Sequence, residues 1–334
     1  CFLAAIGLDD QHADAHVNLA SAFLLAGQEQ QGLKEYEWRL RCPAGSVFAA
    51  HAQPLCPRWH GESPEVSGPL LVVSEQGLGD TLQFVRYVSL LLDLGYSLRL
   101  CVQAKLQALL EQSGFAVSFL SKQQALACSE GVWIPLMSLP HVLGGMHHQF
   151  VSQTPYLHVC AAVQAVWRSR LAAEQRPLIG LNWQGEPRSE VFHLKGRSMA
   201  LECLAPLASA TSGQLLSLQK GAGSEQLLGC SFADRFVAAQ EQIDQAWGFI
   251  DTAAIVLACD LVITTDTAMA HLAGALGVPT WLLLKHVPDW RWGMEGDSTP
   301  WYPNVRLFRQ QPNQNWHHVI RAVVQALGDQ GIQS

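Results

Sequence analysis

The stretch TTDTAMAHLAGALG, residues 264–277, decides the fold class. It follows the segment Cys259 to Ile263, which is typical of a buried strand. The stretch then continues into a helix that opens with Asp and Thr and closes on Gly277 and Pro279. A strand, a polar turn and a helix in this order are typical of an α/β protein, which exposes free helix amides to a phosphate at such a turn. We therefore expect this turn to form the floor of a nucleotide-sugar site.

Composition indicates a globular protein. The 334 residues suffice for two or three domains, and 49% hydrophobic against 15% charged residues allows compact cores. Lys and Arg number 21 against 28 Asp and Glu, a net charge of -7, without a basic run that would follow a phosphate backbone. We therefore expect no nucleic acid as a partner. No apolar run approaches the roughly 18 residues of a membrane span, so none is predicted.

The cysteines indicate a reducing compartment. Nine are scattered singly from Cys1 to Cys259, with no CxxC pair and no Cys/His spacing typical of zinc. We predict no metal site, no cofactor and a cytoplasmic location. The start, Cys1-Phe2-Leu3-Ala4, has neither an initiator Met nor a signal-peptide pattern, so we expect a fragment of a longer chain.

The N-terminal region, residues 1–42, shows helical spacing from Ala13 to Arg39 with a turn at Gly27 and Tyr36 closing the second helix. This spacing resembles one tetratricopeptide repeat, with an ordinary helical hairpin as the alternative. Residues 43–68 are rich in Pro, Gly and Ser and predict a linker that packs through Trp59.

Two Rossmann-like units follow, because strand and helix patterns alternate as in parallel α/β architecture. The first domain, residues 69–160, has strands at 70–74, 98–102, 116–120 and 132–134, a helix from Asp80 to near Gly95 and another at 105–112. A connecting helix is expected within residues 161–176. The second domain, residues 177–334, has strands at 178–183, 214–218, 260–263 and 280–284 and helices at 201–209, 252–258 and from Asp266. Two such domains in tandem predict a cleft between them.

The motif Gly77-Leu78-Gly79-Asp80 follows the first strand of the first domain. It is a poor dinucleotide fingerprint because Leu82 stands where the third glycine belongs. Its glycines allow close backbone approach to a substrate, and Asp80 at a helix N-terminus can accept a proton from an attacking hydroxyl. The alternative is that Asp80 only caps its helix. A base role needs burial or a like-charged neighbour, for which Glu75 is the nearest candidate.

The helix after the 260–263 strand carries the expected donor site. Its first amides, those of Thr267, Ala268 and Met269, are expected to be unpaired and able to bind a diphosphate. Thr264, Thr265 and Thr267 offer hydroxyls, and Asp266 can accept hydrogen bonds from sugar hydroxyls. In the alternative interpretation Asp266 or Thr265 is the helix N-cap. His271, one turn further on, is a packing residue more often than a ligand.

Cations are needed to neutralise a departing diphosphate. Lys195 and Arg197 lie in the loop after the 178–183 strand, and Lys220 directly follows the 214–218 strand. Each is either a phosphate ligand or a solvated surface charge. The aromatic segments Pro288 to Gly293 and Pro300 to Pro303 either pack inside the protein or stack on a sugar or base.

Taken together, these motifs resemble the bacterial tetratricopeptide-repeat glycosyltransferases, whose catalytic half is similar to the heptosyltransferases of glycosyltransferase family 9. The resemblance covers nearly the whole chain through these segments: SEQGLGDTLQFVRY (74–87), WIPLMSLP (133–140), LQKG (218–221), DLVITTDTAMAHLAGALGVPTW (260–281), and PDWRW, PWYP and RLFRQ within 288–310.

The resemblance implies a GT-B fold and inverting, metal-independent transfer of a hexosyl or heptosyl group from a nucleoside-diphosphate sugar to a hydroxyl of a protein or saccharide. It implies that Asp80 is the base and that Asp266, Thr267 and Ala268 belong to the donor site. It also implies a basic phosphate ligand after the first strand of the second domain. There the chain departs from the family pattern, reading EPRSEVFHLKGR at 186–197, which leaves Lys195 and Arg197 as alternatives.

Two other functions remain open. A repeat scaffold with a degenerate transferase domain would bind a protein partner and transfer nothing. A sugar-nucleotide epimerase on the same fold would convert the donor without any acceptor. The repeats are also similar in architecture to those of the O-GlcNAc transferases, in which such repeats hold a protein acceptor.

Overall fold

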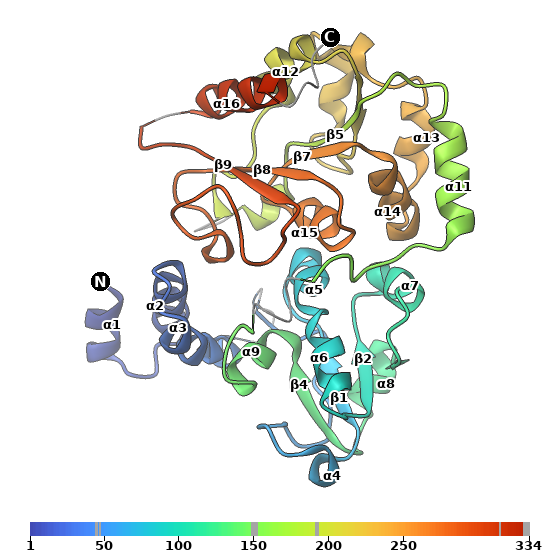
Figure 1. Ribbon diagram of the computed structural model, residues 1–334. Coiled ribbons are helices and arrows are strands. Elements are labelled where there is room, and N and C mark those ends of the chain that lie inside the picture. The colour runs from blue at the N-terminus through green and yellow to red at the C-terminus, as the bar shows by residue number, and fades with distance from the viewer. Residues whose placement is uncertain (44–45, 47, 148–152, 191–193, 314, 330–334) are drawn as a thin grey trace. The chain divides into compact units, whose positions relative to one another are not determined.

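The computed structural model describes residues 1–334 apart from 44–45, 47, 148–152, 191–193, 314 and 330–334 (Figure 1). The chain divides into two compact units. Unit 1 comprises Cys1–Gln153 together with Trp290–Met294, and unit 2 comprises Thr154–Asp289 together with Glu295–Ser334. Among the described residues, no helix combines the length and the apolar character that a bilayer crossing requires.

Unit 1 begins with short helices: α1 (Phe2–Leu8), α2 (Ala13–Leu25), α3 (Glu29–Tyr36) and the 3₁₀ turn η1 (Glu37–Arg41). Helices α2 and α3 form a hairpin whose turn contains Gly27 at φ +74°. Gly32 lets the two helices approach closely, because a Cβ there would lie 2.5 Å from Cγ of Leu24. The expected helical hairpin is therefore present, ending at Tyr36 as predicted. Its assignment as a tetratricopeptide repeat stays a prediction.

Unit 1 contains a four-stranded parallel sheet in the order β3-β2-β1-β4. Its strands are β1 (Leu70–Val73), β2 (Leu98–Cys101), β3 (Ser118–Phe119) and β4 (Val132–Pro135). The helical segments are α4 (Pro64–Ser67), α5 (Leu78–Phe84), α6 (Tyr87–Asp93), α7 (Ala104–Gln112), α8 (Lys122–Leu126), η2 (Leu136–Ser138) and α9 (Leu139–Val142). All four residues of β1 are buried, as expected for an apolar strand inside a parallel sheet.

The single helix expected from Asp80 to near Gly95 is two helices, and it begins earlier, at Leu78. The break lies at residues 85–86, where the Gln83 carbonyl accepts a hydrogen bond from the Arg86 side chain at 2.7 Å. That side-chain bond competes with the regular backbone bond of the helix at this carbonyl.

The linker, residues 43–68, is fixed to unit 1 where it is described. Trp59 is 1% exposed, and its indole donates to the Glu62 carbonyl at 3.0 Å. Its backbone amide donates to the Trp133 carbonyl at 2.8 Å, and its ring packs edge-on against Tyr96. The expectation that the linker packs through Trp59 is confirmed.

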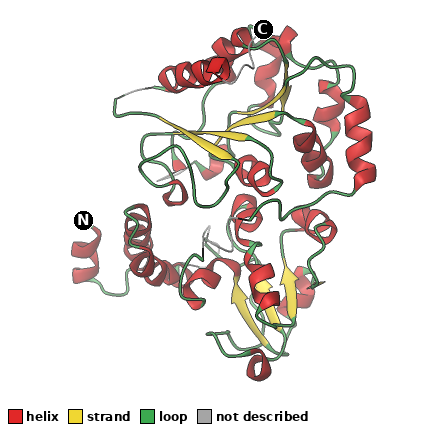
Figure 2. Ribbon diagram, viewed as in Figure 1, coloured by secondary structure: helices red, strands yellow, loops and turns green. Residues whose placement is uncertain are grey.

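Unit 2 contains a five-stranded parallel sheet in the order β6-β5-β7-β8-β9. The strands of both sheets are yellow in Figure 2. Its strands are β5 (Leu178–Asn182), β6 (Gln214–Ser217), β7 (Leu261–Thr265), β8 (Thr280–Leu284) and β9 (Val305–Arg309). Its helices are α11 (Ala161–Arg170), α12 (Ala205–Ala210), α13 (Gln240–Gln245), α14 (Phe249–Ala258), α15 (Ala268–Ala275) and α16 (Trp316–Asp329). The 3₁₀ turns are η3 (Pro187–Ser189), η5 (Leu201–Leu204), η6 (Ser224–Gly229) and η7 (Ala233–Arg235). A further 3₁₀ turn of the chain, η8 (Trp290–Trp292), belongs to unit 1.

The core of unit 2 lies between the sheet and helices α12 and α16. Leu261 and Ile263 of β7 join Leu207 of α12 and Val323 of α16 in one buried cluster. Strand alternation turns the intervening residues of β7, including Thr264, to the opposite face. Strand β8 matches the predicted strand residue for residue, whereas β9 and α16 were not predicted as elements.

Gly131, just before β4, gives a test of the register of the unit 1 sheet. It has φ +71°, and a Cβ there would lie 2.0 Å from the Pro69 carbonyl oxygen, which accepts the Val132 amide. We expect Gly131→Ala to lower the free energy of unfolding by more than about 3 kcal/mol, because a backbone clash adds to the cost of a left-handed Ala. Denaturant unfolding measures the loss.

Gly114 is the matched control, since it has φ +80° but nothing within 4 Å of an added Cβ. Gly114→Ala should cost only about 1–2 kcal/mol, the price of the left-handed conformation alone. Equal losses in the two variants would contradict the packing described for Gly131.

Candidate active site

Asp80 in unit 1 is held by two groups. It is the third residue of α5, and its Oδ2 accepts the Gly77 amide at 2.8 Å. Its Oδ1 accepts a hydrogen bond from Nη2 of Arg291, with which it forms an ion pair. Its side chain keeps 21% exposure, so the carboxylate is still reachable from solvent. The N-cap position belongs to Gly77, and Gly79 is the second residue of the helix.

Arg291 comes from η8 and was not predicted as a site residue. Its Nε donates to Oε1 of Gln83 at 2.7 Å, and its guanidinium lies 4.5 Å from the Trp290 ring. The side chain is only 7% exposed, which strengthens its attraction for the Asp80 carboxylate. The signal in the sequence was the PDWRW motif, whose arginine stands between two tryptophans.

Glu75 does not supply the like charge that a base role of Asp80 was expected to need. Its side chain is fully buried and accepts from Nε and Nη2 of Arg39 at 3.0 and 2.7 Å. The Met137 amide donates to the same carboxylate at 3.0 Å. Since the Arg39 charge balances that of Glu75, the charged partner that Asp80 contacts is the cation Arg291.

In unit 2, Thr267 rather than Asp266 or Thr265 caps helix α15. Its backbone is extended, with φ -139° and ψ 176°, and its hydroxyl accepts the Met269 amide at 3.3 Å. The Met269 amide, expected to be unpaired, is therefore used by the cap. Thr267 can cap because its extended backbone brings its own Oγ1 back over the first turn.

Asn182 connects this cap to the neighbouring strand. Its Oδ1 accepts from the hydroxyls of Thr267 at 2.8 Å and Thr264 at 3.2 Å. Asn182 ends β5, the neighbour of β7 in the sheet. The end of β5 and the start of α15 are thus fixed to each other at the carboxyl edge, where open α/β sheets bind ligands.

Gln219 extends the same network to β6 and was also missed. Its Oε1 accepts from Nδ2 of Asn182 at 2.9 Å and from the amides of Trp183 and Gln184. Its Nε2 donates to the carbonyls of Gln184 and Ala222. Both residues could have been found by listing the polar side chains at the carboxyl ends of predicted neighbouring strands.

The three predicted cations lie in different environments. Lys195 is exposed. Nε of Arg197 lies 3.7 Å from Oε1 of Glu190 in a mostly buried ion pair. The Lys220 ammonium donates to the Ile243 carbonyl, and burial lowers its pKa against the opposing effect of Asp244. Residues 191–193 of the loop that carries Lys195 and Arg197 lie outside the described residues.

Lys285, after β8, is a cation that sequence reasoning missed. Its ammonium donates to the backbone carbonyl of Lys195 at 2.9 Å. Burial lowers its pKa, while the nearby carboxylates of Asp266 and Asp289 act in the opposite direction. Lys285 therefore brings a positive charge near the Asp266 turn that precedes α15.

Thr265 and His271, two further predicted site residues, are buried. Thr265 is fully buried, and its hydroxyl has no hydrogen-bond partner among the described residues. His271 is 5% exposed with its Nδ1 3.0 Å from the Tyr302 hydroxyl, in agreement with a packing role. Ala268 is the first residue of α15. The aromatic residues Trp301 and Tyr302 are buried too, so they pack within unit 2.

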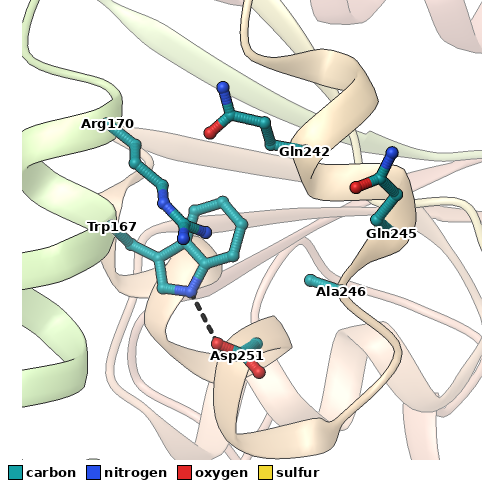
Figure 3. Close-up of a pocket in the computed structure, with 6 residues that line it drawn as sticks. All are labelled: Trp167, Arg170, Gln242, Gln245, Ala246 and Asp251. Carbon is teal, nitrogen blue, oxygen red and sulfur yellow. Dashed lines mark hydrogen bonds between the residues drawn. The ribbon is translucent and has the colours of Figure 1, made fainter.

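Unit 2 also has a separate hollow of about 440 Å³ (Figure 3). The Trp167 indole donates to Asp251 at 2.8 Å there, and the Arg170 guanidinium lies 4.6 Å from the Trp167 ring. The lining residues are Trp167, Arg170, Gln242, Gln245, Ala246 and Asp251. None of the predicted site residues is among them. In the part of the chain that the structure describes, no group of three His, Cys, Asp or Glu residues is arranged to hold a metal ion.

Comparisons with known proteins identify the fold. No protein-family model matches the chain. Protein FlbA of Caulobacter vibrioides is 27% identical over 341 residues, covering 93% of this chain and 54% of FlbA, so the chain spans about half the length of this curated relative. The glycosyl transferase family 9 structure from Veillonella parvula DSM 2008 has a TM-score of 0.54 at 12% identity, covering 84% of this chain and 99% of that chain.

The E. coli heptosyltransferase WaaC with ADP-2-deoxy-2-fluoro heptose has a TM-score of 0.48 at 13% identity, covering 78% of this chain and 99% of that chain. At such identity the Veillonella structure shows a shared fold. The chain therefore has the α/β fold with parallel sheets found in a family 9 glycosyltransferase.

Thr267 offers a test of the network at the edge of the unit 2 sheet. Thr267→Val keeps the shape but removes the hydroxyl, so α15 loses its cap and Asn182 loses a donor. We expect the free energy of unfolding to fall by about 1–2 kcal/mol, measured by urea denaturation. Thr267→Ser keeps the hydroxyl and should stay within about 0.5 kcal/mol of the parent. A Ser variant as unstable as the Val variant would argue against this network.

Proposed function

We propose that the protein is a glycosyltransferase of the GT-B type. It transfers a hexosyl or heptosyl group from a nucleoside-diphosphate sugar to a hydroxyl of a protein or saccharide. The transfer inverts the configuration of the anomeric carbon and needs no metal ion. The observation that carries the proposal is the capped N-terminus of α15 at the carboxyl end of β7, within the fold shared with a family 9 glycosyltransferase. We further propose a cytoplasmic location, supported by nine cysteines that are all free thiols in the described structure.

In this proposal unit 2 binds the donor. The Met269 amide is used by the Thr267 cap, so the amides of Thr267 and Ala268 and the positive end of the helix dipole are the groups that favour a diphosphate. Asp266, directly before the Thr267 cap, accepts hydrogen bonds from the hydroxyls of the sugar. Lys285 lies near Asp266 and joins Lys195 and Arg197 as a candidate to neutralise the departing charge.

Unit 1 supplies the base. The acceptor hydroxyl oxygen bonds to the anomeric carbon while the bond from that carbon to the diphosphate oxygen breaks. The hydroxyl proton passes to the Asp80 carboxylate, and the bonding electrons leave with the diphosphate. The Gly77 amide and Arg291 hold the carboxylate, which fixes its direction for the transfer.

Substitution of the two acids tests the proposal. Asp80→Asn should lower kcat by about 10²–10⁴-fold because the amide takes up no proton. Asp266→Ala should mainly raise the KM for the donor, since it removes an acceptor for sugar hydroxyls. The assay is nucleoside-diphosphate release from a donor panel in the presence of EDTA.

Asp93 at the end of α6 is the control, because it is exposed. Asp93→Asn should match the parent. Parental turnover in both Asp80→Asn and Asp266→Ala would refute the assigned roles.

A second candidate function is a scaffold that binds a protein partner and transfers nothing. The engagement of both Asp80 oxygens, by Gly77 and Arg291, favours it, because this geometry also suits a purely structural carboxylate. A thermal-shift panel of nucleoside diphosphates separates the two functions. Stabilisation by any of them supports the transferase, and stabilisation by none supports the scaffold.

A further inference from the structure

Arg39, in the turn that ends the N-terminal hairpin, is a fully buried cation. Its side chain has 0% exposure, and each of its five N–H groups has an acceptor in unit 1. Nε and Nη2 donate to the two oxygens of Glu75 at 3.0 and 2.7 Å, and Nη2 also donates to Ser138 at 2.8 Å. Nη1 donates to the Tyr36 carbonyl and to Glu37. This fork fixes the position of the Glu75 side chain relative to the hairpin.

Glu75 stands at the start of the loop that carries Asp80. It comes two residues after β1, and the next residue, Gln76, has φ +59° in the left-handed region. Gly77 then donates its amide to Asp80 at 2.8 Å. The conformation of residues 75–77 therefore sets the direction of the hydrogen bond that holds the Asp80 carboxylate.

Tyr36 holds the same loop one residue further on. Its hydroxyl lies 3.1 Å from Oε1 and 2.9 Å from Nε2 of Gln76, so it exchanges hydrogen bonds with that side-chain amide. Its ring packs edge-on against Trp290, the neighbour of Arg291, with centroids 6.4 Å apart. The last turn of the hairpin thus contacts both segments that fix Asp80.

We propose that Tyr36 and Arg39 are positioning residues for Asp80, and that the N-terminal hairpin thereby sets the direction of the proposed base. The functional part of this inference rests on the proposed glycosyl transfer. A buried ion pair is weak support for stability, because apolar residues of similar volume often stabilise as well or better. The Arg39–Glu75 pair is therefore better explained by the exact direction it gives to the loop than by its contribution to folding.

Three variants test the proposal. Tyr36→Phe removes only the hydroxyl, and Arg39→Lys keeps the charge but cannot reproduce the fork to Glu75. Arg39→Met combined with Glu75→Leu replaces the pair by apolar side chains and guards against misfolding caused by one unpaired buried charge. Arg41→Lys is the control, since Arg41 lies in the same turn, is exposed, and stacks on Trp38 instead of contacting the loop.

We expect every variant that melts cooperatively to keep the melting temperature of the parent. We also expect all four variants to keep the parental KM for the donor. Tyr36→Phe, Arg39→Lys and the double variant should lower kcat about 10-fold or more, whereas Arg41→Lys should not. A variant that fails to melt cooperatively is replaced in the comparison by Tyr36→Phe, the mildest change. Parental kcat in Tyr36→Phe and in every folded Arg39 variant would overturn the proposal.

Hydrogen exchange at the amides of residues 76–80 gives a readout that needs no turnover. Exchange should accelerate in Tyr36→Phe and Arg39→Lys and stay unchanged in Arg41→Lys. If the parent protein transfers no sugar but exchange accelerates in these two variants, the proposed function fails while the positioning of the loop stands. Unchanged exchange in both variants would overturn the positioning itself.

Discussion

Parallel pairing of every strand in the two sheets leaves little room for polar side chains. All residues of β1, β5, β7 and β8 are buried, so apolar side chains fill both faces of the central strands. The polar side chains that end β5 and β7, those of Asn182, Thr264 and Thr265, lie at the carboxyl edge, where the chain leaves the sheet. The candidate site residues of both units belong to segments that begin at such an edge.

The two units satisfy this constraint by different chemistry. Unit 2 uses neutral groups, in which the amides of Asn182 and Gln219 and the hydroxyl of Thr267 bond to one another and to backbone. Unit 1 uses charges, and the Arg39–Glu75 pair is shielded from water on both sides. The neutral network of unit 2 keeps its geometry over a wide pH range. The charged pair of unit 1 connects the loop before α5 to a segment 36 residues earlier in the chain.

The sequence predicts the elements better than the contacts between them. Strand β8 and the hairpin turn at Gly27 follow from local patterns of apolar residues and glycine, and both are confirmed. The helix after β1 was predicted as one element because the helical pattern of the sequence continues across residues 85–86, where the structure has the break. The alternative interpretation placed the cap of α15 at Asp266 or Thr265, because three consecutive residues are all good capping residues and only the backbone dihedrals of Thr267 select it.

Contacts over long sequence distances account for the remaining differences. Lys285 and Arg291 contact groups that are 90 and 211 residues away in the chain, and no local signal reports such a distance. Glu75 was the nearest candidate for a like-charged neighbour of Asp80, and its pairing with Arg39, in a different region of the chain, has no local signal either.

The short segment Trp290–Met294 belongs to unit 1, although the chain on either side of it belongs to unit 2. During synthesis, residues 1–153 leave the ribosome long before this segment does. Unit 1 therefore cannot complete its packing until the Thr154–Asp289 part of unit 2 has been translated, and Asp80 meets Arg291 only at that late stage. If the chain were cut after residue 153, the N-terminal piece would lack the five residues Trp290–Met294 that belong to unit 1. Unit 1 is therefore complete only when it is made in one chain with unit 2.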